Sequence, residues 1–175
     1  MTDQAPILPS STAFTLREAI EDDIAAMVEV INAAFDKENF FVNRPRTSPT
    51  QLVEHFRTGR FLLAHESSQL ISSVYYELKG ERGYVGMLAV HPNNQGCGLG
   101  RTMMQAAENM LRDHGCKVAE IYVVSVRTAL LPIYRKMGYQ ETGTVQLPEE
   151  LREKLTMPIE LIKMEKQLQS SSGEV

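Results

Sequence analysis

The sequence lacks a long apolar run, has few cysteines and carries no excess of basic residues, and each shortage excludes a class of protein. No apolar run reaches the roughly 18 residues that a membrane-spanning helix needs. Cys97 and Cys116 are too few for a disulfide framework. No C-x-x-C motif or Cys/His cluster indicates a zinc site. We therefore expect no membrane contact and no bound metal.

Charge is nearly balanced, with 18 basic and 22 acidic residues and a net charge of -4. A nucleic-acid binder usually concentrates an excess of basic residues on one face, so we expect no nucleic-acid partner. Residues 1–11 lack the basic start and apolar centre of a secretory signal. These observations predict a reducing compartment, with the cytoplasm as the default location and the nucleus as an alternative.

The length of 175 residues predicts one domain, since domains average roughly 150 residues. Residues 1–11 contain two prolines and two serines without periodicity, which predicts a disordered lead. Residues 169–175 predict a flexible tail for the same reason. The single domain is expected to occupy residues 12–168.

Periodicity predicts a chain that mixes helices and strands. Apolar residues at helical spacing predict helices over 24–35, 50–58, 100–114 and 129–136, with a helical turn near 148–155. Alternating or β-branched segments predict strands over 14–17, 61–64, 70–78, 84–90, 121–126, 139–145 and 159–164. This order of elements predicts a mixed α/β sheet.

A glycine-rich loop between the strand at 84–90 and the next helix is the most informative segment. It reads Gln95-Gly96-Cys97-Gly98-Leu99-Gly100-Arg101. Glycines let the backbone approach a ligand closely and adopt positive φ. The N–H groups and dipole at the start of the following helix favour an anion, above all a pyrophosphate.

The spacing of the glycines distinguishes among phosphate-binding motifs. A dinucleotide fingerprint would need glycine where Arg101 stands, and no Gly-Lys-Ser or Gly-Lys-Thr of a nucleotide P-loop occurs. A nucleotide-binding α/β domain is therefore disfavoured. The pattern that fits is Q/R-x-x-G-x-G/A, supplied by Gln95, Gly98 and Gly100.

Segments on both sides of the loop extend this pattern. They are Leu88-Ala89-Val90-His91-Pro92 before it, Arg127, Leu130, Tyr134 and Gly138-Tyr139 after it, and Leu16-Arg17-Glu18-Ala19 with Asp22-Asp23-Ile24 near the start. With these segments the sequence resembles the GNAT superfamily of acetyl-CoA-dependent N-acetyltransferases, from about residue 14 to residue 168. The resemblance implies an α/β (α+β) GNAT fold, with a mixed, mostly antiparallel sheet of six or seven strands flanked by about four helices.

The resemblance also implies how acetyl-CoA is bound. Backbone amides of the loop, from Gln95 through Gly96, Cys97, Gly98, Leu99 and Gly100 to Arg101, are expected to bind the CoA pyrophosphate. The strand end at Leu88, Ala89 and Val90 is expected to pair with the pantetheine amides. Arg127 stands where the family commonly has asparagine, and it is expected to reach CoA or an acidic group of the acceptor, with a role at the surface as the alternative. Cys97 is expected to be a small filler residue, because direct transfer needs no acyl-enzyme.

For catalysis, the resemblance places Tyr134 as the general acid that protonates the departing thiolate. Many relatives carry a glutamate base where this sequence has Gly86. Glu77, His91 and waters held by backbone carbonyls stay open as replacements. The backbone N–H of Val90 is the expected oxyanion donor.

The implied function is transfer of an acetyl group from acetyl-CoA to a primary amine of a small molecule or peptide. The alternative is a non-catalytic module that binds acyl-CoA. Acceptor specificity is expected from residues 35–49 and 146–158, where Phe40 and Phe41 lie near Arg44 and Arg46. These four residues favour a partly apolar acceptor that bears a carboxylate or phosphate. Relatives often pair through their C-terminal strands, which makes a homodimer one expectation.

Overall fold

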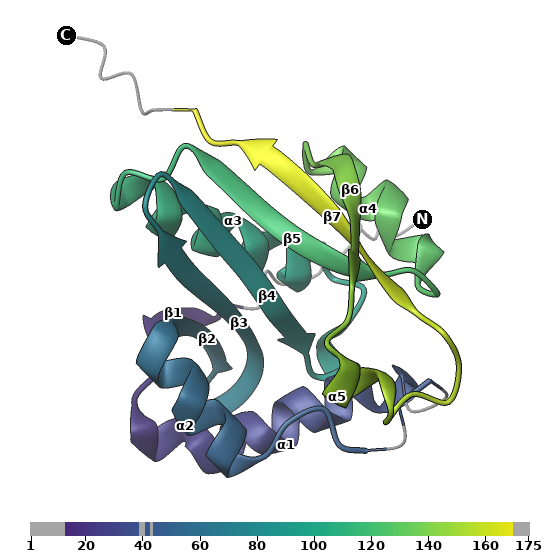
Figure 1. Ribbon diagram of the computed structural model, residues 1–175. Helices are drawn as coiled ribbons and strands as arrows, with labels where there is room; N and C mark the ends of the chain where they lie inside the picture. Colours follow the sequence, from purple (N-terminus) through teal and green to yellow (C-terminus); the bar gives the residue numbers. More distant parts are fainter. Residues whose placement is uncertain (1–12, 39–40, 43, 170–175) are drawn as a thin grey trace, which may run out of the picture.

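The computed structural model describes residues 13–38, 41–42 and 44–169 (Figure 1). The expected disordered lead, nearly all of the expected tail, and Phe40 lie outside the described residues. The strands are β1 (Thr15–Glu18), β2 (Arg60–Glu66), β3 (Gln69–Lys79), β4 (Arg82–Val90), β5 (Val118–Val124), β6 (Gln140–Gln146) and β7 (Glu160–Gln167). The α-helices are α1 (Ile24–Phe35), α2 (Pro49–Thr58), α3 (Leu99–Asp113), α4 (Leu131–Lys136) and α5 (Glu149–Arg152).

The strands form one seven-stranded sheet in the order β1-β2-β3-β4-β5-β7-β6. Every neighbouring pair is antiparallel except β4 and β5, which are parallel. The prediction of a mixed, mostly antiparallel sheet with six or seven strands is confirmed. The two strands predicted over 61–64 and 121–126 differ at their ends, because β2 extends in both directions and β5 begins at Val118 and ends at Val124.

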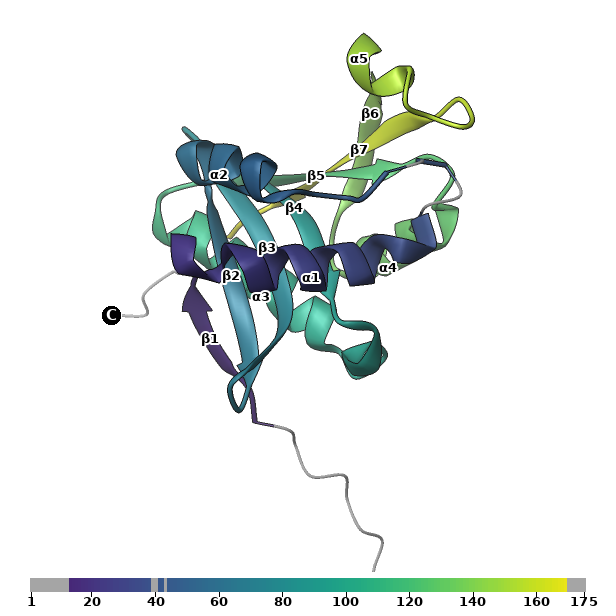
Figure 2. The same cartoon turned by 90° about the horizontal axis from the view of Figure 1, so that it is seen from below.

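Helices cover the two faces of the sheet and bury two clusters of apolar side chains (Figures 1 and 2). On one face, α1 inserts Met27 and Ile31, both fully buried, against β2, β3 and β4. On the other face, α3 buries Met103, Ala107 and Leu111. These residues recur at the helical spacing that the sequence shows, so burial of one stripe per helix fixes both helices on the sheet.

Local sequence signals set where these helices begin and end. At the start of α2, the Ser48 hydroxyl accepts a hydrogen bond from the N–H of Gln51, and Pro49 takes the first helical position. After α3, Gly115 adopts φ +86, a left-handed conformation that ends the helix. The predicted ends of both helices are therefore confirmed to within a residue or two.

The parallel pairing of β4 with β5 is short. Residues Arg82–Tyr84 pair with Val118–Glu120. The structure describes every residue of both strands, and it shows no pairing between them beyond these three pairs. From this point β5 stays paired along its length with β7, while β4 continues to Val90 beside β3. Figure 1 shows the two strands diverging. The sheet is therefore closed at one end of β4 and split at the other.

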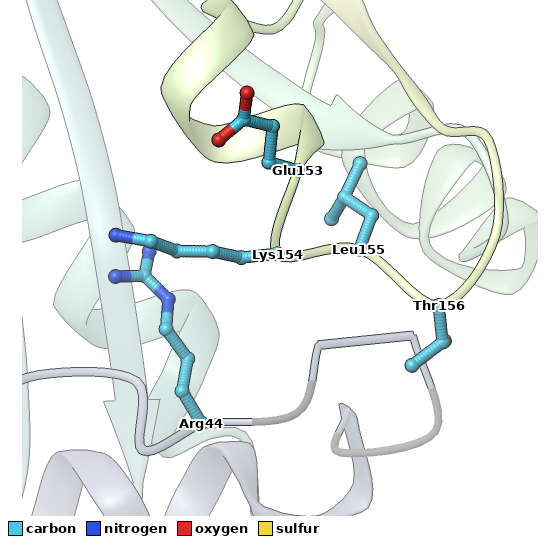
Figure 3. Close-up of a pocket in the computed structure, with 5 residues that line it drawn as sticks. All are labelled: Arg44, Glu153, Lys154, Leu155 and Thr156. Carbon is cyan, nitrogen blue, oxygen red and sulfur yellow. The ribbon is translucent and has the colours of Figure 1, made fainter.

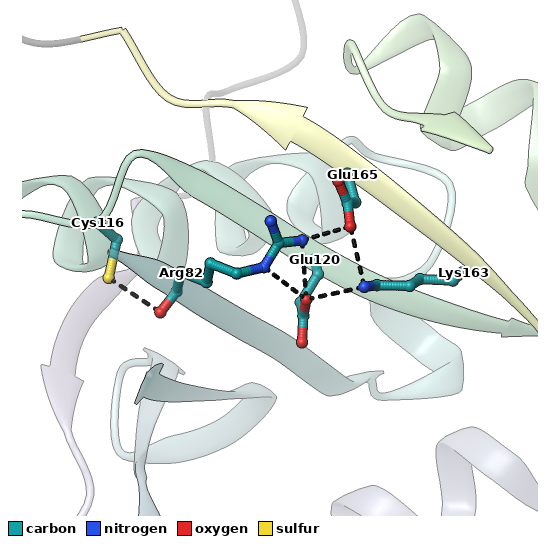
Figure 4. A network of polar contacts seen from close by, with 5 residues as sticks. All are labelled: Arg82, Cys116, Glu120, Lys163 and Glu165. Atoms are coloured by element: carbon teal, nitrogen blue, oxygen red, sulfur yellow. Dashed lines mark hydrogen bonds and ion pairs between the residues drawn. The ribbon is translucent and has the colours of Figure 1, made fainter. Parts of the chain in front are cut away.

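A network of charged side chains joins the strands at the closed end (Figure 4). The Arg82 guanidinium donates to the buried Glu120 carboxylate at 3.1 Å and also to Glu165. The Lys163 ammonium lies 2.9 Å from Glu165 and 3.4 Å from Glu120. The Cys116 thiol donates to the Arg82 carbonyl at 3.4 Å. Two cations thus balance two carboxylates, which is how ionised groups are retained at a partly buried position.

This network makes the stability of the fold depend on pH. Hydrogen bonding to Lys163 and the charge of Arg82 hold the pKa of Glu165 below its ordinary value of 4.5. Because the folded pKa is the lower one, the stabilisation is complete above about pH 4.5 and is lost as pH falls through the folded pKa. We expect Glu165→Gln to lower the free energy of unfolding by about 1 kcal/mol at neutral pH.

Urea denaturation of the wild type and Glu165→Gln, at neutral pH and again below pH 4, measures this dependence. The difference between the two proteins should shrink in acid. Glu29→Gln, on the exposed side of α1, is the matched control and should change stability little at either pH. A difference for Glu165→Gln that stays constant with pH would contradict the assignment.

Candidate active site

The divergence of β4 from β5 opens a cleft of about 870 Å³. Its walls come from β4, β5, the loop before α3, the segment from Arg127 to Met137, the end of α1 with the residues that follow it before α2, and residues within and on either side of α5. The residues predicted to bind acetyl-CoA or to act in catalysis that line it are Leu88, Val90, Gln95, Gly96, Gly98, Leu99, Gly100, Arg101, Arg127 and Tyr134, and those predicted for the acceptor are Phe41, Arg44 and Arg46. Chain segments far apart in the sequence therefore meet at one cleft.

A bulge in β4 shapes one wall of the cleft. Between the pairs Ser73–Ala89 and Tyr75–Gly86, two steps along β3 face three steps along β4, and Met87 adopts φ +48. The extra residue turns Met87 toward α1, while Leu88 on its other side packs toward α3. After Tyr84 the edge of β4 on the β5 side is free of strand pairing. A free strand edge offers backbone groups to an extended ligand.

Of the residues predicted to bind acetyl-CoA, Ala89 and Cys97 lie outside the cleft lining. The Ala89 methyl group is buried in the cluster on the α1 side, and its carbonyl accepts a hydrogen bond from the Ser72 hydroxyl at 2.7 Å. The Cys97 thiol is exposed and donates to the Asn94 carbonyl at 3.0 Å. Both residues therefore have only backbone atoms to offer a ligand in the cleft.

The loop before α3 is attached to the end of β4 and leads directly into the helix. The Gln95 amide donates to the Val90 carbonyl at 3.0 Å. Gly96 and Gly98 adopt φ +82 and +85, a conformation that glycine takes without strain. Gly98 begins α3 without a side-chain cap, so the first N–H groups of the helix have no side-chain partner there. With the helix dipole behind them, these groups form a site suited to an anion.

Tyr134 and the end of β5 form the opposite wall. The ring of Tyr134 meets the ring of Tyr139 edge to face, with centroids 6.1 Å apart. The Tyr139 hydroxyl donates to the buried Glu108 carboxylate at 2.8 Å, and the Lys166 ammonium lies 2.6 Å from the same carboxylate. Burial raises the pKa of Tyr139, so it stays a hydrogen-bond donor. Tyr134 therefore packs against a ring that is fixed by its own polar partners.

Tyr84 occupies the space above Gly86, where many relatives have a glutamate. A Cβ at Gly86 would collide with the hydroxyl and ring of Tyr84, so the glycine is required by its neighbour. Burial raises the pKa of Tyr84, although the positive charge of Arg46 opposes the rise. The Tyr84 ring also lies 5.8 Å from that of Tyr122, which lines the cleft from β5. In the sequence both tyrosines stand within strongly apolar strands, where nothing marks them as residues of a site.

The charge of the cleft comes from cations. Among the described residues that line it, the charged ones are Arg44, Arg46, Arg101, Arg127 and Lys136. The two base candidates, Glu77 and His91, lie outside this lining. Glu77 accepts a hydrogen bond from Tyr75 at 3.3 Å, and the His91 ring accepts one from the Asn93 N–H at 3.2 Å. The cleft is therefore electrostatically suited to an anionic ligand.

Within residues 13–38, 41–42 and 44–169, no three His, Cys, Asp or Glu side chains gather in a way that could hold a metal ion. In the same part of the chain, no helix is both long and apolar enough to cross a membrane.

Relatives by sequence include two acetyltransferases of Yersinia. The acetyltransferase YE1169 of Yersinia enterocolitica is 31% identical over 91 residues, which are 52% of this chain and 64% of that protein. An acetyltransferase of Yersinia pestis is 30% identical over 91 residues with the same coverage. The matched part of the chain thus spans just under two thirds of the length of these relatives.

Solved structures share the fold at low sequence identity. The ribosomal-protein-S18-alanine N-acetyltransferase of Escherichia coli matches with a TM-score of 0.71 and 14% identity, over 93% of this chain and 99% of that one. The structure of yncA from Salmonella typhimurium with acetyl-CoA matches with a TM-score of 0.68 and 20% identity, over 92% and 97% of the two chains. These likenesses confirm the expected GNAT fold.

The family model of the acetyltransferase (GNAT) domain matches residues 20–167. That range includes the diverging strands β4 and β5, the glycine-rich loop and Tyr134. Because the model covers most of the sequence, this chain belongs to the GNAT acetyltransferase family.

Proposed function

We propose that this protein transfers the acetyl group of acetyl-CoA to a primary amine. The observation that carries the proposal is the cleft between β4 and β5, with the uncapped start of α3 at one wall and Tyr134 at the other. The Yersinia relatives are named acetyltransferases, and the Salmonella structure holds acetyl-CoA. These names support the same reaction.

The residues of the cleft suit the parts of acetyl-CoA. The N–H groups at the start of α3 would bind the pyrophosphate, and Arg101, Arg127 and Lys136 supply cations for its phosphates. The pantetheine amides would pair with the free edge of β4 near Leu88, Ala89 and Val90. The phosphates would therefore lie at the start of α3, and the thioester would lie beside β4.

In the reaction, the nitrogen of a neutral amine attacks the thioester carbonyl carbon, and the bond from carbon to sulfur breaks. The CoA thiolate takes a proton from the Tyr134 hydroxyl, which is restored from water. A thiol with a pKa of about 8.5 and a phenol of about 10 are close enough for this exchange. The N–H of Val90 would stabilise the oxyanion that forms at the carbonyl. The proton released by the amine leaves to solvent.

The position that carries a glutamate in many relatives has no base here, since Gly86 lies beneath the Tyr84 ring. The raised pKa of Tyr84 keeps its hydroxyl protonated at neutral pH. We infer that the amine reaches the thioester already neutral, with water rather than a side chain accepting its proton. Cations that line the cleft favour the neutral form of an amine because they repel its ammonium form.

We also retain a cytoplasmic location and a homodimer as predictions. Cys97 and Cys116 are free thiols, which suits a reducing compartment. Strand β6 lies at one edge of the sheet with exposed residues, which gives a second copy a surface to pair with. Size-exclusion chromatography with light scattering measures the oligomeric state.

Removal of the Tyr134 hydroxyl tests the catalytic role. We expect Tyr134→Phe to lower kcat by about 100-fold or more, because a general acid contributes that much to a proton transfer. The Kd of acetyl-CoA, measured by calorimetric titration, should stay unchanged. The assay follows free thiol released from acetyl-CoA over a panel of primary amines.

The control is Tyr122→Phe, a tyrosine of the same cleft to which we assign no proton transfer. It should retain most of kcat. Equal turnover by Tyr134→Phe and the wild type would remove the assignment of Tyr134. Tight binding of acetyl-CoA without thiol release across the panel would favour the alternative, a non-catalytic acyl-CoA module.

Two glycines of the loop provide a matched pair for the phosphate site. Gly98→Ala should destabilise the fold by about 1 kcal/mol, because φ +85 is unfavourable for alanine, and should weaken acetyl-CoA binding. Gly100→Ala places its Cβ at 3.6 Å from Leu88 in ordinary contact, inside a helix that alanine favours. It should preserve stability. Thermal denaturation and calorimetric titration of both variants measure the two effects.

A further inference from the structure

Two loops far apart in the sequence meet beside the cleft. We call the part of the cleft lined by Phe41, Arg44, Arg46 and Leu155 its mouth. Val42 and Leu155 form an isolated antiparallel bridge, and the N–H of Thr156 donates to the Phe41 carbonyl at 3.0 Å. One loop follows α1 and the other follows α5. Residues 41–42 and 155–156 are therefore held beside each other by backbone hydrogen bonds.

The two loops bring a pair of cations to one pocket of about 490 Å³ (Figure 3). Arg44 from the first loop and Lys154 from the second both line it, with their charged ends toward the same side. The carboxylate of Glu153, which also lines the pocket, points away from them. Neither Arg44 nor Lys154 forms an ion pair with any residue that the structure describes. The charged lining of this pocket thus consists of two cations and one carboxylate.

Arg44 connects this pocket to the cleft, since it lines both. Arg46 adds a third positive charge to the cleft, and its guanidinium lies 5.1 Å above the Phe35 ring. The surrounding wall is apolar, with Phe35, Phe41 and Leu155 among its residues. The mouth therefore combines a concentrated positive charge with an apolar lining.

Like charges held close together raise each other's energy, and an anion that binds between them relieves the repulsion. A guanidinium matches a carboxylate or phosphate with two parallel hydrogen bonds, and an ammonium adds a third donor. An amine without an anionic group would instead enter a field that repels its protonated form. The mouth thus selects on the net charge of the acceptor.

We propose that the acceptor is a small primary amine that carries a carboxylate or phosphate on an apolar body, and that Arg44 and Lys154 bind this anionic group. The inference rests on the proposed acetyl transfer. The sequence pointed to Arg44 and Arg46 for such a group, and the structure adds Lys154 from the other loop. The anion would anchor at the mouth while the amine extends into the cleft toward the thioester.

Pairs of amines that differ by one anionic group test the proposal. Phenylalanine is compared with phenylalaninamide and phenethylamine, and phosphoethanolamine with ethanolamine. We expect kcat/KM to be about tenfold or more higher for the anionic member of at least one pair, since a hydrogen bond to a charged group contributes this much. The pair that shows the larger preference identifies carboxylate or phosphate as the group bound.

The variants Arg44→Gln and Lys154→Gln should each reduce that preference by about tenfold, through KM rather than kcat. Rates with the amines that lack an anionic group should not fall, because each substitution removes a positive charge that repels their protonated form. Arg57→Gln, on the exposed surface of α2, removes one positive charge away from the mouth and should leave the preference intact. Lys154→Arg keeps the charge and should restore most of the preference.

A binding measurement separates this inference from the proposed reaction. Calorimetric titration of the anionic amines into the protein saturated with CoA should give a Kd that Arg44→Gln weakens about tenfold, whether or not turnover occurs. Failure of acetyl-CoA to bind or react would overturn the proposed function alone. Acetylation of charged and uncharged amines at equal rates, or anion binding that both substitutions leave unchanged, would overturn this inference alone.

Discussion

The short parallel pairing of β4 and β5 is the constraint on which the cleft depends. Three residue pairs join the strands, after which β5 remains hydrogen-bonded to β7 and β4 to β3. Each strand therefore keeps one complete ladder, so splitting the sheet costs only the hydrogen bonds of the shared edge. Ion pairs among Arg82, Glu120, Lys163 and Glu165 join β4, β5 and β7 at the end of the sheet from which β4 and β5 separate. These contacts hold the strands together there, so the positions of β4 and β5 at the cleft are defined.

The two apolar clusters explain how a split sheet remains ordered. Helix α3 packs against one face and is preceded by the loop with the positive-φ glycines, while α1 packs against the other face and precedes residues 41–42 and 44–46 along the chain. Two parts of the cleft wall are thus each attached to a helix of a separate cluster. Tyr134, which also lines the cleft, packs against a tyrosine whose hydroxyl is fixed by Glu108.

Local features of the chain could be predicted from the sequence, and features that depend on distant contacts could not. The stripes of α1 and α3 and the ends of α2 follow from helical spacing and capping residues, and they are confirmed. The Tyr84 ring above Gly86 depends on the bulge at Met87, which an apolar run does not signal. Lys154 and Arg44 line one pocket because Val42 bridges Leu155 and so brings the two loops together. The roles of Gln95 to Arg101, Arg127 and Tyr134 in binding and catalysis stay predictions.

The bridge between Val42 and Leu155 has a consequence for how this protein could diverge. The two segments that it joins lie outside the strands of the sheet and outside the glycine-rich loop. Substitutions at the exposed positions there, such as Arg46 and Lys154, leave the two apolar clusters and the start of α3 untouched, so they carry little cost in folding. New acceptors could therefore arise by variation in two short surface segments, while the part of the chain suited to acetyl-CoA is inherited unchanged.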